Sequence, residues 1–269
     1  MKLAFSSLSC PSCDVDGLIR TAVQYGFGGL ELRTLENTIN LWELEDFQPS
    51  RLHDTRGKFS QAGLELLVVG TSISFAKPEP EHRTRQIELL KKFCVIAQGL
   101  GCPYLRVFGG PIPERQTYDE VLDRDIKGYR EAIEIADSYG VGLLFETHDD
   151  FSTSAALLPL LEGVDKKAGV IWDILHPYRF GEDMETTCKQ LLPYIRHVHI
   201  KDSVTYSRTG FDMALPGQGN IPIQTAVSLL AKAGYDRYLC FEWEKHWHPE
   251  IQDASIALPH YVSYMKGIL

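Results

Sequence analysis

The sequence predicts an α/β protein that folds as a single (β/α)8 barrel over residues 1–269. Short apolar runs of strand length alternate with longer amphipathic segments from one end of the chain to the other. This alternation implies a parallel sheet, because each strand must return through a crossover helix. Eight such units in 269 residues take about 34 residues each, which suits a closed barrel. An open doubly wound sheet is the alternative, but the segment Phe5–Leu8 lacks the glycine-rich turn that normally follows its first strand.

The eight predicted strands are apolar runs, and several are bounded by Gly, Pro or Asp. In chain order they span Lys2–Ser6, Gly29–Arg33, Leu64–Gly70, Tyr104–Phe108, Gly142–Glu146, Gly169–Asp173, Ile195–Lys201 and Tyr238–Glu242. Because side chains alternate along a strand, each run sends one set of residues into the barrel and the other set toward the surrounding helices.

The segments between these strands carry apolar residues at helical spacing. In the first segment, Val15, Leu18 and Ala22 fall on one face, and Gly26 stands where the helix should end. The seven predicted helices span Asp14–Tyr25, Thr84–Leu100, Tyr118–Tyr139, Ser154–Leu161, Met184–Leu192, Ile223–Ala233 and Ile251–Ile268. The longest irregular pieces, where a barrel keeps its functional loops, are Glu36–Pro49, Ile73–Glu81 and Ser203–Gly219.

The composition is that of a soluble globular protein, with 44% hydrophobic and 23% charged residues. The 27 basic and 36 acidic residues give a net charge of −9, which argues against a nucleic-acid partner. No stretch approaches the roughly 18 apolar residues of a membrane helix, and the start MKLAFSSLSC is too weak for a signal peptide. We therefore expect a cytoplasmic protein without a membrane partner. Its six scattered cysteines, Cys10 and Cys13 included, should be free thiols.

Four of the predicted strands carry metal-binding residues at or near their carboxyl ends. Glu146 ends the fifth strand, Asp173 the sixth and Glu242 the eighth, while His199 lies in the seventh. In a (β/α)8 barrel the carboxyl ends of the strands form the active site. Alternation places the three carboxylates on the inner face, because the large apolar residues of the same strands fall on the other face.

Three carboxylates brought together would repel one another unless a cation neutralised them. Three oxygen ligands and one imidazole nitrogen suit a divalent cation; we expect Mn²⁺ first, and Mg²⁺, Co²⁺ and Zn²⁺ are compatible alternatives. Each of these residues alone is more often a cap, a loop acceptor or a packed core residue. Four such residues, all on the inner face of successive strands, predict a single bound divalent cation.

At this point the sequence resembles the xylose isomerase-like TIM barrels, a family of sugar isomerases, ketose 3-epimerases, inosose isomerases and dehydratases, and endonuclease IV. The motifs that carry the resemblance are Phe145-Glu146-Thr147, Asp173-Ile174-Leu175-His176, His197-Val198-His199-Ile200-Lys201-Asp202, Pro216-Gly217-Gln218-Gly219 and Phe241-Glu242-Trp243. The resemblance covers nearly the whole chain and is densest from Gly142 to Glu242. It implies a TIM barrel and does not identify one substrate.

The resemblance implies that Glu146, Asp173, His199 and Glu242 ligate one divalent cation. In the ketose epimerases the first and last glutamates also transfer protons, so Glu146 and Glu242 are the candidate catalytic acid and base. A metal that bridges a carbonyl and a neighbouring hydroxyl oxygen lowers the pKa of the α-proton, and two carboxylates can move that proton between opposite faces.

The function we expect is therefore a metal-dependent isomerase or epimerase of carbohydrate metabolism. It would act on a ketose, keto-polyol or related sugar through an enediolate. Its partner is that small molecule, and self-association into a homo-oligomer stays open.

Three further residues are candidate substrate contacts. The resemblance makes His176 a contact to a substrate hydroxyl, with a plain loop histidine before Pro177 as the alternative. Family epimerases carry an arginine a few residues after the strand-seven histidine, and Arg208 is the candidate here. Lys201 shares the parity of His199 and is placed to reach a hydroxyl or a carboxylate.

Other enzyme classes use related chemistry on the same barrel. A keto-polyol dehydratase or lyase, resembling inosose dehydratase, needs an additional acid to expel hydroxide, and His148 or His176 is available for this. An endonuclease IV-like repair enzyme is a remote alternative, since it needs three metals and further histidines. This chain has Phe108 where that nuclease carries a metal-binding histidine, and Asp212-Met213-Ala214 lacks the histidine of an Asp-x-His pattern. A non-catalytic barrel that binds metal or sugar remains a third class.

Charged and aromatic residues elsewhere have simpler interpretations. Glu31 and Arg33 share a face of the second strand, and Glu31 paired with an arginine is expected to be structural. The glycine-rich segment Gly217–Gly219 has no basic residue beside it, which favours an unphosphorylated substrate. Trp243 and Trp247 either wall a sugar site or, in the case of Trp243, pack against the last helix.

Overall fold

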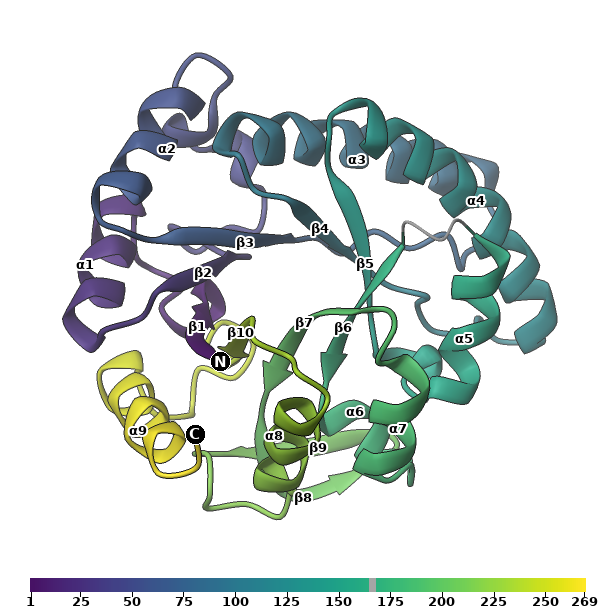
Figure 1. The fold of residues 1–269 in the computed structure, drawn as a ribbon. Coiled ribbons are helices and arrows are strands. Elements are labelled where there is room, and N and C mark those ends of the chain that lie inside the picture. Colours follow the sequence, from purple (N-terminus) through teal and green to yellow (C-terminus); the bar gives the residue numbers. More distant parts are fainter. Residues whose placement is uncertain (165–167) are drawn as a thin grey trace.

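The computed structural model describes residues 1–164 and 168–269, and these contain a closed barrel of eight parallel strands (Figure 1). Around the barrel the strand order is β1-β10-β7-β6-β5-β4-β3-β2, and β1 closes the ring by pairing with both β2 and β10. The strands are β1 (Lys2–Ser6), β2 (Gly29–Leu32), β3 (Glu65–Gly70), β4 (Tyr104–Val107), β5 (Gly142–Glu146), β6 (Gly169–Asp173), β7 (Ile195–Ile200) and β10 (Tyr238–Phe241). The predicted (β/α)8 barrel is therefore confirmed.

Helices surround the barrel on its outside (Figure 1). They are α1 (Val15–Tyr25), α2 (Leu52–Gln61), α3 (Pro80–Leu100), α4 (Tyr118–Ser138), α5 (Ser154–Gly163), α6 (Leu175–Arg179), α7 (Met184–Leu191), α8 (Ile223–Lys232) and α9 (Ala254–Lys266). Short 3-10 helices cover Ser7–Ser9, Leu41–Glu43, Glu45–Phe47 and Asp149–Phe151. In the described part of the chain, no helix combines the length and the apolar character that a bilayer crossing requires.

Alternation along the strands separates two apolar layers. Phe145, Trp172 and Phe241 belong to the large core between the barrel and the helices. Leu144 and Ile171 instead form a small cluster inside the barrel. The inner faces of β5 and β6 therefore end at Glu146 and Asp173, as the parity argument predicts.

Helices α2 and α6 and the two strands that follow β7 differ from the sequence-based expectations. Helix α2 was not predicted, because only Leu52, Thr55 and Phe59 of its residues are buried and the apolar pattern is weak. The segment Ser203–Gly219, expected to be irregular, contains most of an antiparallel hairpin of β8 (Asp202–Ser207) and β9 (Gly210–Ala214). This hairpin follows β7 outside the barrel, so the eighth barrel strand is β10.

Local signals fix both ends of α1 and the carboxyl end of α3 where they were expected. The Asp14 carboxylate accepts a hydrogen bond from Gly17 N at 2.7 Å and caps α1. Gly26 and Gly101 end α1 and α3 with φ of 75° and 68°, a region that glycine adopts without strain. All six cysteines are free, as predicted.

Candidate active site

Four side chains converge at the carboxyl end of the barrel. Glu146 ends β5, Asp173 ends β6, His199 lies in β7 and Glu242 follows β10. Each is at most 2% exposed, and one ligand atom from each lies within 4.8 Å of those of the other three. The structure thus brings together all four residues that the sequence assigned to a metal.

The ring of His199 is held from both sides. Its Nε2 lies 2.7 Å from Glu31 Oε2, while its Nδ1 lies 3.2 Å from Glu242 Oε2 and 3.4 Å from Glu146 Oε1. Burial opposes ionisation of Glu31, but His199 and His197 outweigh it and lower the pKa of this carboxyl group. An ionised Glu31 only accepts hydrogen bonds, so Nε2 carries a proton and Nδ1 faces the other carboxylates. Glu31 therefore pairs with histidines, and its expected pairing with an arginine is wrong.

Two buried cations contact the same carboxylates. Arg106 Nη1, on β4, lies 3.0 Å from both Glu146 Oε2 and Glu242 Oε1. Lys201 Nζ lies 2.8 Å from Asp173 Oδ2 and also contacts Glu242 and Glu244 at 2.5 Å.

Burial and the nearby charges shift the pKa values of these groups in opposite senses. Burial would raise the pKa of Glu242, but His199, Lys201 and Arg106 outweigh it and lower that pKa well below its usual value. Burial would likewise lower the pKa of Lys201, but Asp173, Glu242 and Glu244 raise it well above its usual value. Asp173 keeps a raised pKa, because its burial outweighs the attraction of Lys201.

The cluster fits a divalent cation even with these two side chains in place. Both carboxylate oxygens of Glu146, Asp173 Oδ2, Glu242 Oε2 and His199 Nδ1 are buried. Their partners among the described residues are the ion pairs that they form with one another, with Arg106 and with Lys201. Burial opposes a charge on His199, but Glu242, Glu31 and Glu146 outweigh it and raise its pKa well above the usual value. A cation bound among these carboxylates would take the place of the proton on Nδ1. Three carboxylates and an imidazole are a donor set that Mn²⁺, Mg²⁺, Co²⁺ and Zn²⁺ accept.

A cavity of about 280 Å³ lies over the cluster. It is lined by Leu8, Arg33, Ser72, Arg106, Phe108, Glu146, His148, Lys201, Glu242, Glu244 and Trp247. Its floor thus includes Glu146 and Glu242, and Trp247 is 47% exposed at its rim. A cavity of this size suits a small molecule.

The predicted substrate contacts lie in different surroundings. Lys201 lines the cavity, as described. His176 is buried beside the cluster, with Nε2 3.6 Å from Asp173 Oδ2 and its ring 4.4 Å from that of His148. Arg208 is exposed on the turn of the β8–β9 hairpin, with its guanidinium 5.5 Å from the Phe180 ring, and does not line the cavity.

The two tryptophans after β10 have different roles. Trp243 is fully buried, and its Nε1 donates to Gln252 O at 2.7 Å. Its place is in the outer core, so the packing interpretation holds for it. Trp247 is the one that lines the cavity.

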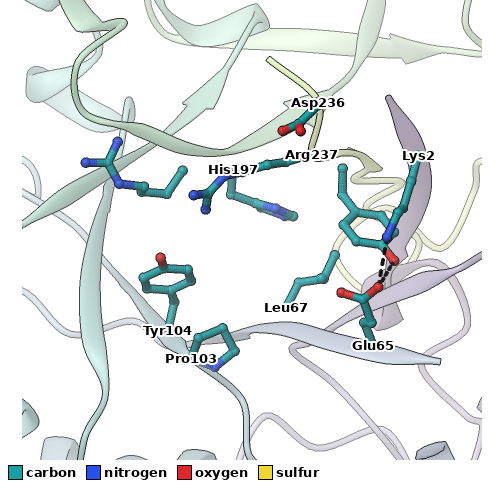
Figure 2. Close-up of a pocket in the computed structure, with 10 residues that line it drawn as sticks. Lys2, Glu65, Leu67, Pro103, Tyr104, His197, Asp236 and Arg237 are labelled. Carbon is teal, nitrogen blue, oxygen red and sulfur yellow. Dashed lines mark hydrogen bonds and ion pairs between the residues drawn. The ribbon is translucent and has the colours of Figure 1, made fainter. Parts of the chain in front are cut away.

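A second pocket of about 340 Å³ opens at the opposite mouth of the barrel (Figure 2). Lys2, Glu65 and Tyr104, at the amino ends of their strands, line it together with His197. Lys2 Nζ pairs with Glu65 at 3.0 Å, and Tyr238 Oη donates to the same carboxylate at 2.8 Å. The Glu65 carboxylate therefore already has two partners. None of Glu146, Asp173, His199 and Glu242 lines this pocket.

Comparisons with known proteins agree with this fold. The family model described as "Xylose isomerase-like TIM barrel" matches residues 19–260. An uncharacterized protein of Methanocaldococcus jannaschii is 30% identical over 51% of this chain and 49% of its own length, so the match spans about half of that relative. The L-ribulose-5-phosphate 3-epimerase UlaE of Salmonella paratyphi C is 22% identical over 84% of this chain and 81% of its own.

Solved structures share the fold over almost the whole chain. The IOLI protein with a bound zinc atom superposes with a TM-score of 0.84 at 18% identity, covering 100% of this chain and 98% of that one. A D-tagatose 3-epimerase-like protein gives a TM-score of 0.80 at 22% identity, with coverage of 100% and 98%. The probable 3-DHS dehydratase AsbF from Bacillus anthracis gives 0.82 at 17% identity, with coverage of 99% of both chains.

The glycine-rich segment Pro216–Gly219 wraps around one carboxylate. Asp202 accepts hydrogen bonds from Gly217 N at 2.8 Å, Gly219 N at 3.0 Å and Ile221 N at 3.1 Å. A Cβ at Gly219 would lie 2.2 Å from Asp202 Oδ1, so glycine is required for this close approach. The amide groups that might have cradled a phosphate are therefore already used inside the protein.

We expect Asp202→Asn to destabilise the protein, because a neutral amide replaces a carboxylate that accepts several backbone hydrogen bonds. Such charged hydrogen bonds contribute about 1.5–3 kcal/mol each, so a loss of about 1–3 kcal/mol in unfolding free energy is expected. Denaturant titration measures it, with Asp123→Asn on the exposed side of α4 as the matched control. Equal stability of the two variants would contradict the anchoring role.

Proposed function

Because the chain belongs to the xylose isomerase-like TIM barrel family, we propose that it is a metal-dependent isomerase or epimerase of a ketose, keto-polyol or related sugar. The observation that carries the proposal is the position of Glu146 and Glu242. They come from separate strands, both contact His199 Nδ1 and line the floor of one cavity. The printed activities of the Salmonella relative and of the D-tagatose 3-epimerase-like structure support the choice of an epimerase.

Glu146, Asp173, His199 and Glu242 would hold the cation, for which Mn²⁺ is our first choice. When bound, such an ion polarises a substrate carbonyl and makes the neighbouring carbon–hydrogen bond more acidic. The zinc in the IOLI structure supports a divalent metal on this fold.

Glu146 and Glu242 would move the proton on the substrate carbon. Arg106 contacts both carboxylates and keeps them ionised, which is the form that accepts a proton. One glutamate takes the proton from one face, and the other returns it on the opposite face. Lys201 is placed to orient a substrate oxygen, since it lines the cavity beside Glu242.

Dehydration of a keto-polyol is the second candidate. His148 lines the cavity next to Glu146 and supplies an acid that could protonate a leaving hydroxyl group. The structural likeness to the Bacillus anthracis dehydratase is compatible with this reaction. The function is tested on a panel of ketoses and inososes with added Mn²⁺, following solvent deuterium uptake at the carbon next to the carbonyl. An isomerised or epimerised product supports the first candidate, and an unsaturated product supports the second.

Protein refilled with Mn²⁺ is expected to contain about one equivalent of metal per chain, because the four ligand atoms form one compact donor set. His199→Ala should lose most of it by elemental analysis. Two or three tightly bound ions in the wild-type protein would instead favour the nuclease alternative.

Glu146→Gln and Glu242→Gln should each reduce turnover by at least about 10²–10⁴-fold, because the amide keeps an oxygen ligand but removes the base. The measurement is deuterium exchange at the substrate carbon with metal-saturated protein. Wild-type exchange rates in both variants would show that another residue carries the proton, with His176 the first to examine.

Glu31→Gln is expected to weaken Mn²⁺ binding about tenfold to a hundredfold, because the amide no longer fixes the Nε2–H tautomer of His199. Metal affinity is measured by calorimetry on protein checked for an unchanged melting temperature. Glu134→Gln, exposed on α4, is the control. Unchanged affinity in Glu31→Gln would mean that the ring of His199 is held without Glu31.

A further inference from the structure

Arg33 is a buried cation of the cavity that has no carboxylate partner. It follows β2, is 3% exposed and lines the cavity. Among the described residues no carboxylate oxygen lies within 4.0 Å of its guanidinium, and its side chain makes one hydrogen bond, from Nη2 to Ser72 Oγ at 2.6 Å. Its Nε is buried without a partner. Arg106 and Lys201, the other cations of the cavity, each contact two or more carboxylates.

The fold holds Arg33 in this position. Ser7 Oγ accepts hydrogen bonds from the backbone N–H of Arg33 at 2.8 Å and of Thr34 at 3.1 Å. A Cβ at Gly70 would lie 2.9 Å from Arg33 Cδ and 3.5 Å from Arg106 Nη2, so β3 leaves room for both side chains. The Trp247 ring lies 5.9 Å from Arg33 Cζ on the open side. These neighbours therefore fix the position of the guanidinium, while its Nε has no hydrogen-bond partner.

Such an arrangement is costly without a ligand. Removing a guanidinium from water carries a penalty of several kcal/mol unless hydrogen bonds and an opposite charge compensate for it. Burial, together with the charge of Arg106, lowers the pKa of Arg33 to about 9, which leaves it charged at neutral pH. An anion in the cavity would supply the missing partner.

We propose that Arg33 binds an anionic oxygen group of the substrate, a carboxylate or a phosphate, and that the substrate is a sugar acid or sugar phosphate rather than a neutral sugar. This inference rests on the proposed function, whose site it extends. Arginine presents a planar fork of N–H donors that matches either group. Ser72 Oγ accepts from Arg33 and has its own proton left to donate to the same anion.

The charges within the cavity set the direction in which the substrate lies. Arg106 and Lys201 are already paired with carboxylates, whereas Arg33 has none, so an anionic group is directed toward Arg33, Ser72 and Trp247. The neutral carbonyl end is left over the cluster of ligand residues. The sequence favoured an unphosphorylated substrate only because the Gly217–Gly219 segment lacks a basic residue; Arg33 reaches the cavity from another strand.

The test uses full-length protein loaded with Mn²⁺ and pairs of unreactive probes that differ by one charged group. D-Arabinonate is compared with D-arabinitol, and glycerol 3-phosphate with glycerol, by calorimetry on wild type and Arg33→Met. We expect at least one anion to bind about tenfold or more tighter than its neutral partner, and this preference to disappear in Arg33→Met. The acid or the phosphate that shows the preference identifies the substrate class.

Arg85→Met, exposed on α3, is the matched control and should keep the preference. Ser72→Ala should reduce it, and this variant replaces Arg33→Met if the latter does not fold. Equal binding of charged and neutral probes by wild type, or an unchanged preference in the folded variants, overturns the proposal.

Turnover separates this inference from the proposed function. If neutral ketoses react as well as charged ones and Arg33→Met does not change kcat/KM, the isomerase assignment stands and the anion site is wrong. If no ketose reacts but the anion preference depends on Arg33, the anion site stands and the assigned reaction is wrong.

Discussion

The repulsion among three buried carboxylates is the constraint on which the rest of the site depends. Glu146, Asp173 and Glu242 meet at the carboxyl end of the barrel, where each is at most 2% exposed. Water does not screen these charges, so the protein must compensate them with cations. Arg106 and Lys201 supply part of this compensation, and a divalent cation bound by Glu146, Asp173, His199 and Glu242 would supply the rest.

Compensation of these buried charges depends on closure of the barrel, because the interacting side chains come from strands far apart in the chain. Glu31 and His199 are 168 residues apart in sequence but 2.7 Å apart in space. Pairing of β1 with both β2 and β10 brings this half of the barrel together. Opening the sheet at β1 would separate buried charges from their partners. The integrity of the site and the stability of the closed barrel are therefore coupled.

Much of this arrangement could be predicted from the sequence, because strand alternation is a local property. The inward parity of Glu146 and Asp173 followed from their own strands, and the barrel followed from the repeated units. Contacts across the barrel are not local, so the sequence paired Glu31 with an arginine and did not place Arg33 in the site. Hydrogen bonding also escaped prediction, since nothing local indicates that Asp202 occupies the amides of the glycine-rich loop.

The two mouths of the barrel show why unsatisfied buried atoms locate a site better than cavity size does. The pocket at the amino ends is the larger, at about 340 Å³ against 280 Å³. Its Lys2–Glu65 pair is exposed, and an exposed pair stabilises little. His197 Nε2, which is buried there without a hydrogen bond, already lies 3.5 Å from Glu31 Oε2. At the carboxyl ends, Glu146 and Asp173 are buried against the charged groups of Arg106, Lys201 and His199, and Arg33 Nε is buried without a hydrogen-bond partner. A folded protein keeps the free-energy cost of burying such groups where a bound ligand offsets it. This distinguishes the carboxyl mouth of the barrel as the candidate active site.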